Sequence, residues 1–204
     1  MPPEPRGGLP GPVVALLGLI LAGCTEPASR LRIESHRAGE APVVLSENFE
    51  RCYYGRDARG NVEIVLRSAR PSTLDVDAEL VQLVWARTFW RPVPGTTYAE
   101  RTQTNATIGY ALLDAGRGIS YEGAGFVFFS EQPDGRIKGQ IETATLAPGR
   151  ASGDAPELFG QCLVSGDFIA ERSEGEVKAA LSELRRSLGR PPRYRPGDPL
   201  RELR

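Results

Sequence analysis

The stretch QCLVSGDFIAER, residues 161–172, alternates apolar or small side chains with polar ones. Its apolar or small side is formed by Cys162, Val164, Gly166, Phe168 and Ala170. Polar residues, among them Gln161, Ser165 and Asp167, fall on the opposite side. A period of two residues is typical of a β-strand with one buried face. The stretch therefore predicts a half-buried strand with Cys162 on its buried side.

The same period extends from about residue 43 to about residue 172. Residues 74–80, LDVDAEL, show the cleanest alternation and predict another half-buried strand. Turn signals recur at 57–60 (DARG), 114–118 (DAGRG) and 133–135 (PDG). The fold class is thus expected to be mainly β, with six to eight antiparallel strands. The pattern does not separate an antiparallel β-sandwich from a meander closed into a barrel.

The period changes at Ser173, which forms a capping box with Glu176. Gly189 supplies the stop signal. Between them, one apolar stripe at helical spacing is formed by Val177, Ala180, Leu181, Leu184 and Leu188. We expect one C-terminal amphipathic helix that packs on the sheet; a helix lying on a membrane surface is the alternative.

Composition narrows the function classes. The 204 residues fit one domain, and 25 basic against 26 acidic residues leave a net charge of −1. No global positive field would attract nucleic acid, so a nucleic-acid partner is not expected. Only Lys138 and Lys178 are lysines, and we interpret the arginine excess as coding bias rather than as a recognition surface.

The N-terminal stretch VVALLGLILAGCTEP, residues 13–27, is the most apolar of the chain. Its apolar run of about ten residues is half the length of a membrane-spanning helix. A weakly positive start, an apolar run and small residues before Cys24 have the order of a secretory signal. An ordinary signal peptide and a cytosolic N-terminal tail are the alternatives.

Leu21-Ala22-Gly23-Cys24 resembles the lipobox of bacterial lipoproteins. The resemblance implies cleavage before Cys24 and acylation of its thiol, which would anchor the protein to a membrane outside the cytoplasm. Thr25 rather than Asp follows, which by the same resemblance implies an outer membrane facing the periplasm. The expected organisation is a signal peptide (1–23), a lipid-anchored tether (24–42), a β-rich domain with its helix (43–189) and a disordered basic tail (190–204).

Cys52 and Cys162 then remain as a pair in an oxidising compartment, and a disulfide between them is the natural expectation. Two free buried thiols are the alternative. Such a bond would close a loop of about 110 residues, which the chain-entropy model credits with roughly 4 to 5 kcal/mol.

Residues that could carry chemistry are few. His36, the single histidine, falls in the expected tether, and the acids Asp75, Asp77 and Glu79 are expected on a solvated strand face. Trp90, beside Arg91 and Pro92, is a candidate contact residue. We predict no catalytic site, no metal and no cofactor.

The leading hypothesis is a non-enzymatic envelope lipoprotein that binds or scaffolds another envelope component, a protein or a polymer, while its lipid anchor holds the membrane. A carrier of a small apolar ligand in a barrel or sandwich cavity is the alternative, and a hydrolase that uses carboxylates alone is a third hypothesis.

Overall fold

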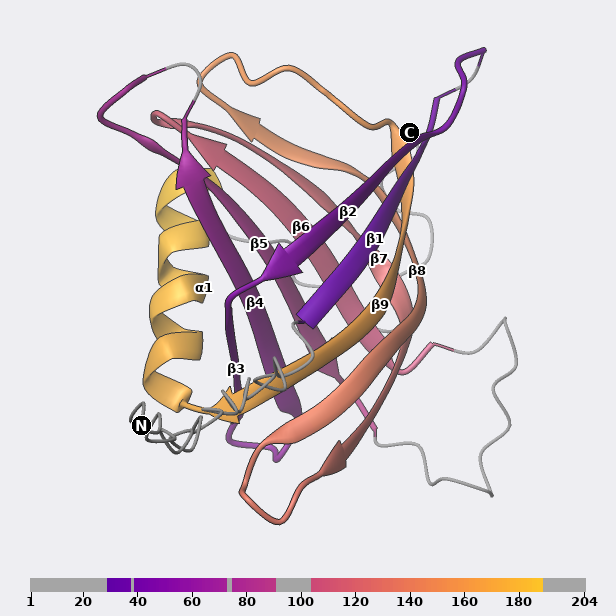
Figure 1. The fold of residues 1–204 in the computed structure, drawn as a ribbon, viewed down its shortest axis with the longest axis vertical. Helices are drawn as coiled ribbons and strands as arrows, with labels where there is room; N and C mark the ends of the chain where they lie inside the picture. Colours follow the sequence, from indigo (N-terminus) through magenta and orange to yellow (C-terminus); the bar gives the residue numbers. More distant parts are fainter. Residues whose placement is uncertain (1–28, 38, 73–74, 91–103, 189–204) are drawn as a thin grey trace, which may run out of the picture.

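The computed structural model describes residues 29–37, 39–72, 75–90 and 104–188, which form one nine-stranded sheet with a helix on its outer face (Figure 1). In chain order the elements are β1 (Ser29–His36), β2 (Val43–Phe49), β3 (Arg51–Arg56), β4 (Val62–Pro71), β5 (Glu79–Thr88), β6 (Ala106–Asp114), β7 (Arg117–Glu131), β8 (Ile137–Ser152), β9 (Gln161–Arg172) and α1 (Glu174–Leu188). The predicted mainly β fold with a C-terminal helix is confirmed.

Strand β9 closes the sheet. Strands β3 to β8 follow one another as neighbours, and β9 pairs with β8 along one edge and with β1 and β3 along the other. The pairing with β3 is parallel and involves Tyr53 and Tyr54, whereas the other pairings between strands are antiparallel. Of the two arrangements that the sequence left open, the observed order is therefore that of a meander closed into a barrel.

Strands β2 and β3 are separated only by Glu50. Strand β2 pairs with β1, whereas β3 pairs with β4, so the chain changes its neighbour at Glu50. This change brings the start of β1 close to the start of β3, because Ser29 lies opposite Phe49.

The folded part begins earlier than the sequence predicted. Residues 29–36, placed in the tether, form β1, and the side chains of Leu31 and Ile33 are fully buried. Polar and charged residues surround these two side chains, and β1 is stabilised by hydrogen bonding to β2 on one edge and to β9 on the other. Leu31 and Ile33 are the only apolar residues of this strand, and an alternation of two apolar positions is too short to indicate a strand.

The strand expected at residues 74–80 is also corrected. Asp75–Ala78 belong to the turn between β4 and β5, and Val76 is 96% exposed. The Asp75 carboxylate accepts a hydrogen bond from the backbone N–H of Asp77, and the Asp75 carbonyl accepts one from Ala78. Aspartate side chains that bond to nearby backbone compete with a strand ladder, so the alternation here belongs to a turn.

Two apolar cores lie on opposite faces of the sheet. The inner core fills the closed sheet with side chains from the strands and the loop before β9, and its largest buried members include Tyr110, Tyr121 and Phe168. The outer core joins α1 to β4, β5 and β6 through Val177, Ala180, Leu184 and Leu188. The Ser173 hydroxyl accepts a hydrogen bond from the Glu176 N–H at 3.3 Å, as the capping box predicts. The expectation that the helix packs on the sheet is confirmed.

Within the described ranges, no helix has both the length and the apolar character that crossing a membrane requires.

Candidate ligand-binding groove

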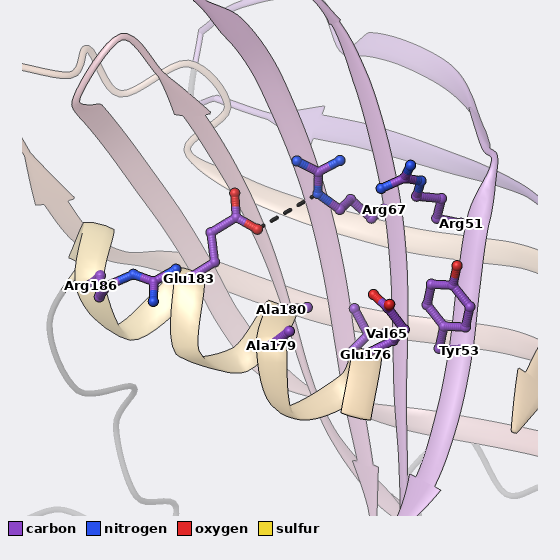
Figure 2. A pocket seen from close by; sticks show the side chains of 9 residues that line it. All are labelled: Arg51, Tyr53, Val65, Arg67, Glu176, Ala179, Ala180, Glu183 and Arg186. Carbon is purple, nitrogen blue, oxygen red and sulfur yellow. Dashed lines mark ion pairs between the residues drawn. The ribbon is translucent and has the colours of Figure 1, made fainter. Parts of the chain in front are cut away.

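A groove of about 220 Å³ runs between α1 and the outer face of β3 and β4 (Figure 2). The sheet side contributes Arg51, Tyr53, Val65 and Arg67. The helix side contributes Glu176, Ala179, Ala180, Glu183 and Arg186. The groove is therefore lined by three arginines, two glutamates and a phenol around a small apolar floor.

Strand and helix periodicity explain why these side chains meet. Arg51 and Tyr53 are two positions apart on β3, so both point outward, whereas Cys52 and Tyr54 between and beyond them are buried in the inner core. On α1, Glu176 and Glu183 are seven positions apart and lie along one side of the helix. The small side chains of Ala179 and Ala180 stand between them.

The pairing register places two positive charges side by side. Arg51 lies directly opposite Arg67 in the antiparallel pairing of β3 with β4. Like charges at directly opposed positions destabilise a sheet. Figure 2 shows both side chains on the same side of the two strands, with Glu183 reaching from α1 toward Arg67.

Only part of this charge is compensated inside the protein. The Arg67 Nε atom lies 3.6 Å from a carboxylate oxygen of Glu183. Among the described residues, neither Arg51 nor Arg186 has a carboxylate within ion-pair distance, and the Tyr53 hydroxyl has no hydrogen-bond partner. The groove thus contains two arginines and a tyrosine hydroxyl without a partner among the described residues, together with the unpaired carboxylate of Glu176.

A second hollow of about 250 Å³ lies on the other side of α1, where Gly55, Arg56, Glu63, Lys178 and Arg185 contribute to its lining. Several of its charges are already paired. Arg56 contacts Glu131 at 2.5 Å, and Glu63 lies 3.8 Å from Arg87. Two further cations in its lining, Lys178 and Arg185, have no ion pair among the described residues.

The cysteines are placed differently from the expectation. Cys24 lies outside the described residues. Cys52 and Cys162 are both buried free thiols. Because Tyr53 pairs with Glu171, Cys52 lies near Ala170, eight positions along β9 from Cys162.

Eight strand residues span about 26 Å, whereas a disulfide needs Cα atoms about 4.4 to 6.8 Å apart. The expected disulfide is incompatible with this register, and the structure shows the alternative of two free buried thiols. Burial raises the pKa of each thiol to about 11, and at Cys52 a hydrogen bond with Ser29 opposes this rise.

Trp90 follows β5 and is 39% exposed. Its ring lies edge-on to Phe126, with centroids 5.7 Å apart, and Phe126 contacts Phe128 at 4.6 Å. The candidate contact residue is therefore the exposed member of an aromatic cluster whose Phe126 is buried.

Aromatic side chains fill the interior of the closed sheet, where a carrier of a small apolar ligand would need a cavity. Tyr110 stacks on Tyr121 at 6.2 Å, and Phe159 contacts both rings. The Tyr110 hydroxyl donates to Gln82 at 2.6 Å, and the Tyr121 hydroxyl accepts from the backbone N–H groups of Leu158 and Phe159. Burial raises the pKa of both tyrosines, so they act as neutral packing and hydrogen-bonding groups.

Candidate groups for metal or acid/base chemistry are dispersed. Across the described part of the chain, no three His, Cys, Asp or Glu side chains come close enough together to hold a metal ion. His36 lies on β1 rather than in a tether, 3.5 Å from a carboxylate oxygen of Glu34. Asp75 and Asp77 belong to the turn before β5 rather than to a strand face.

Sequence reasoning missed the groove arginines. They come from β3, β4 and α1, and no local motif joins them. The excess of arginine over lysine is the one available signal in the sequence, and coding bias explains it equally well. Comparisons of the chain with protein-family models, with curated proteins and with solved structures find no match.

Proposed function

We propose that this protein is an envelope lipoprotein whose non-enzymatic β-domain binds another component while an acylated Cys24 tethers it to a membrane outside the cytoplasm. The membrane proposed is an outer membrane, on its periplasmic side, because Thr25 follows the cysteine. Two features support this role: the lipobox-like residues 21–24 and the position at which the first described strand begins.

The observation that carries the proposal is the short distance along the chain from Cys24 to the sheet. Strand β1 begins at Ser29, five residues after Cys24. A fully extended chain spans at most about 3.6 Å per residue, so the link can be no longer than about 18 Å. A lipid on Cys24 would therefore hold the folded domain against the membrane surface rather than on a long tether.

A binding role is supported by where the unpaired polar groups lie. The interior is packed with aromatic side chains, whereas Arg51, Arg186 and the Tyr53 hydroxyl line an outer groove. The exposed ring of Trp90, which is supported by the buried Phe126, offers a separate contact for an envelope protein or polymer.

The tether is tested by metabolic labelling with a palmitate analogue in a bacterial host that processes lipoproteins. Wild type should be labelled and recovered with membranes, and Cys24→Ala should lose the label. Cys162→Ala is the matched control and should keep it, because that thiol is buried in the core. A Cys24→Ala variant that remained labelled would refute the proposal.

Partner binding is tested by a photo-crosslinking amino acid in place of Trp90 in intact cells. Val44, 43% exposed on β2, is the control position because its exposure is close to the 39% of Trp90. A defined adduct from position 90 that is absent from position 44 supports a partner contact. Identical adducts from both positions, or none from position 90, would contradict it.

A further inference from the structure

We propose that the groove between α1 and β3–β4 binds the phosphate group of a lipid headgroup in the membrane that carries the protein. This inference rests on the proposed function, because it is the tether that would bring the groove to a lipid surface. It names a ligand for the opposed arginines Arg51 and Arg67.

The pairing register places the groove near the proposed anchor. Ser29, the first residue of β1, lies opposite Phe49 on β2, and Arg51 follows two residues later. Opposed residues in an antiparallel pair have Cα atoms about 5 Å apart, and two strand residues add about 7 Å. The Arg51 backbone is therefore within about 12 Å of Ser29, which a lipid on Cys24 would hold within about 18 Å of the membrane.

The charge of the groove matches a phosphate. Arg51 and Arg67 are opposed in register, and within the described ranges Glu183 pairs with Arg67 but not with Arg51. A guanidinium group donates hydrogen bonds in a planar fork that fits phosphate oxygens, and a phosphate has enough acceptor oxygens to bridge two such groups. An anion bound between Arg51 and Arg67 would attract both guanidinium groups and so offset the repulsion between them.

Other groups define which end of the groove the phosphate occupies. Figure 2 shows the Tyr53 hydroxyl directed toward the Arg51 end, where it can donate to an anion. Figure 2 shows the Glu176 carboxylate beside Val65 and Tyr53 and away from the guanidinium group of Arg67, and its negative charge disfavours an anion in that part of the groove. The site is therefore the Arg51–Arg67 end of the groove.

Vesicle binding tests the site in the full chain carrying Cys24→Ala, which removes the acylated thiol. Co-sedimentation compares vesicles of phosphatidylcholine with vesicles of phosphatidylcholine and phosphatidylglycerol. In this background Arg51→Gln and Arg67→Gln should each lower binding to the anionic vesicles by about fivefold, the usual effect of one cation at such a surface. Any contribution of the N-terminal apolar run is common to all variants and cancels in the comparison.

Arg59→Gln is the matched control for charge, because Arg59 lies in the turn at the other end of β3 and has no ion pair among the described residues. It should bind as the parent does. Arg51→Gln should also melt no lower than the parent without vesicles, since it removes a like-charge contact. That result separates loss of ligand binding from loss of folding.

The remaining outcomes decide the source of the phosphate. Loss of vesicle binding in both groove variants supports the proposal, whether or not inorganic phosphate competes. Equal loss in Arg59→Gln, no loss in Arg51→Gln, or binding of inorganic phosphate without binding of anionic vesicles overturns it. Failure of the palmitate label with a persistent Arg51 effect would refute the tether alone, and a labelled protein without an Arg51 effect would refute this inference alone.

Discussion

Asn105 is expected to be the most sensitive polar position in the domain. Its side chain is fully buried just before β6, where the register of β7 shifts between Phe126 and Val127. The Asn105 amide donates to the Val127 carbonyl at 2.8 Å and accepts from the Val127 N–H at 2.8 Å. Its side chain thus extends the pairing with β7 by one residue before Ala106, the first residue of β6.

Replacing Asn105 by alanine would leave the N–H and the C=O of the fully buried Val127 without these partners. Each unsatisfied buried group costs about 1 to 3 kcal/mol, so the loss for the two groups should be about 2 to 6 kcal/mol, out of about 5 to 15 kcal/mol for a typical domain. Urea unfolding followed by circular dichroism measures it as a lower midpoint at unchanged slope. Asn48→Ala, at an exposed position on β2, is the control and should change stability by less than about 0.5 kcal/mol. If the two variants unfolded at the same midpoint, the side-chain ladder would not contribute as inferred.

Denatured, unreduced protein should be alkylated at both Cys52 and Cys162, whereas native protein should react slowly because both thiols are buried with a pKa of about 11; a missing adduct at either site would show that the thiols are not free. Stability should also fall as the pH rises from about 9 toward 11, because the unfolded chain has then lost thiol protons that the folded chain retains, and a flat profile would argue against buried thiols. Gly109→Ala should cost about 1 to 3 kcal/mol and change the tryptophan emission, because a Cβ there would overlap the indole ring of Trp85 on the neighbouring strand. Gly175→Ala, with open space around it, is the control, and equal unfolding midpoints for the two glycine variants would contradict this packing.

Local patterns predicted the elements whose structure depends on local chemistry. The alternation around Cys162 and Phe168 is that of β9, and the Ser173 cap and the apolar stripe give α1. The turns predicted at 57–60 and 133–135 are also confirmed, because Gly60 and Gly135 adopt positive φ there. In each case the information lies within a few residues of the element.

Features that depend on register were not predictable. The strand at Ser29–His36 is stabilised by its two neighbours, and Val76 shows that a regular alternation can occur in a solvated turn. The separation of Cys52 from Cys162 follows from the parallel contact of β3 with β9, which no sequence pattern indicates. The opposition of Arg51 and Arg67 has the same origin, so the groove could be found only in three dimensions.

The pairing of β1 with β9 has a consequence for how the protein is made. These strands lie more than a hundred residues apart in the chain, and Ser35 near the N-terminal end pairs with Cys162. During synthesis β1 therefore leaves the ribosome long before β9, and the sheet cannot close until β9 is available for pairing. Native contacts at such long range slow folding and prolong the exposure of unpaired edges. A nascent chain would depend on protection from aggregation until β9 has emerged.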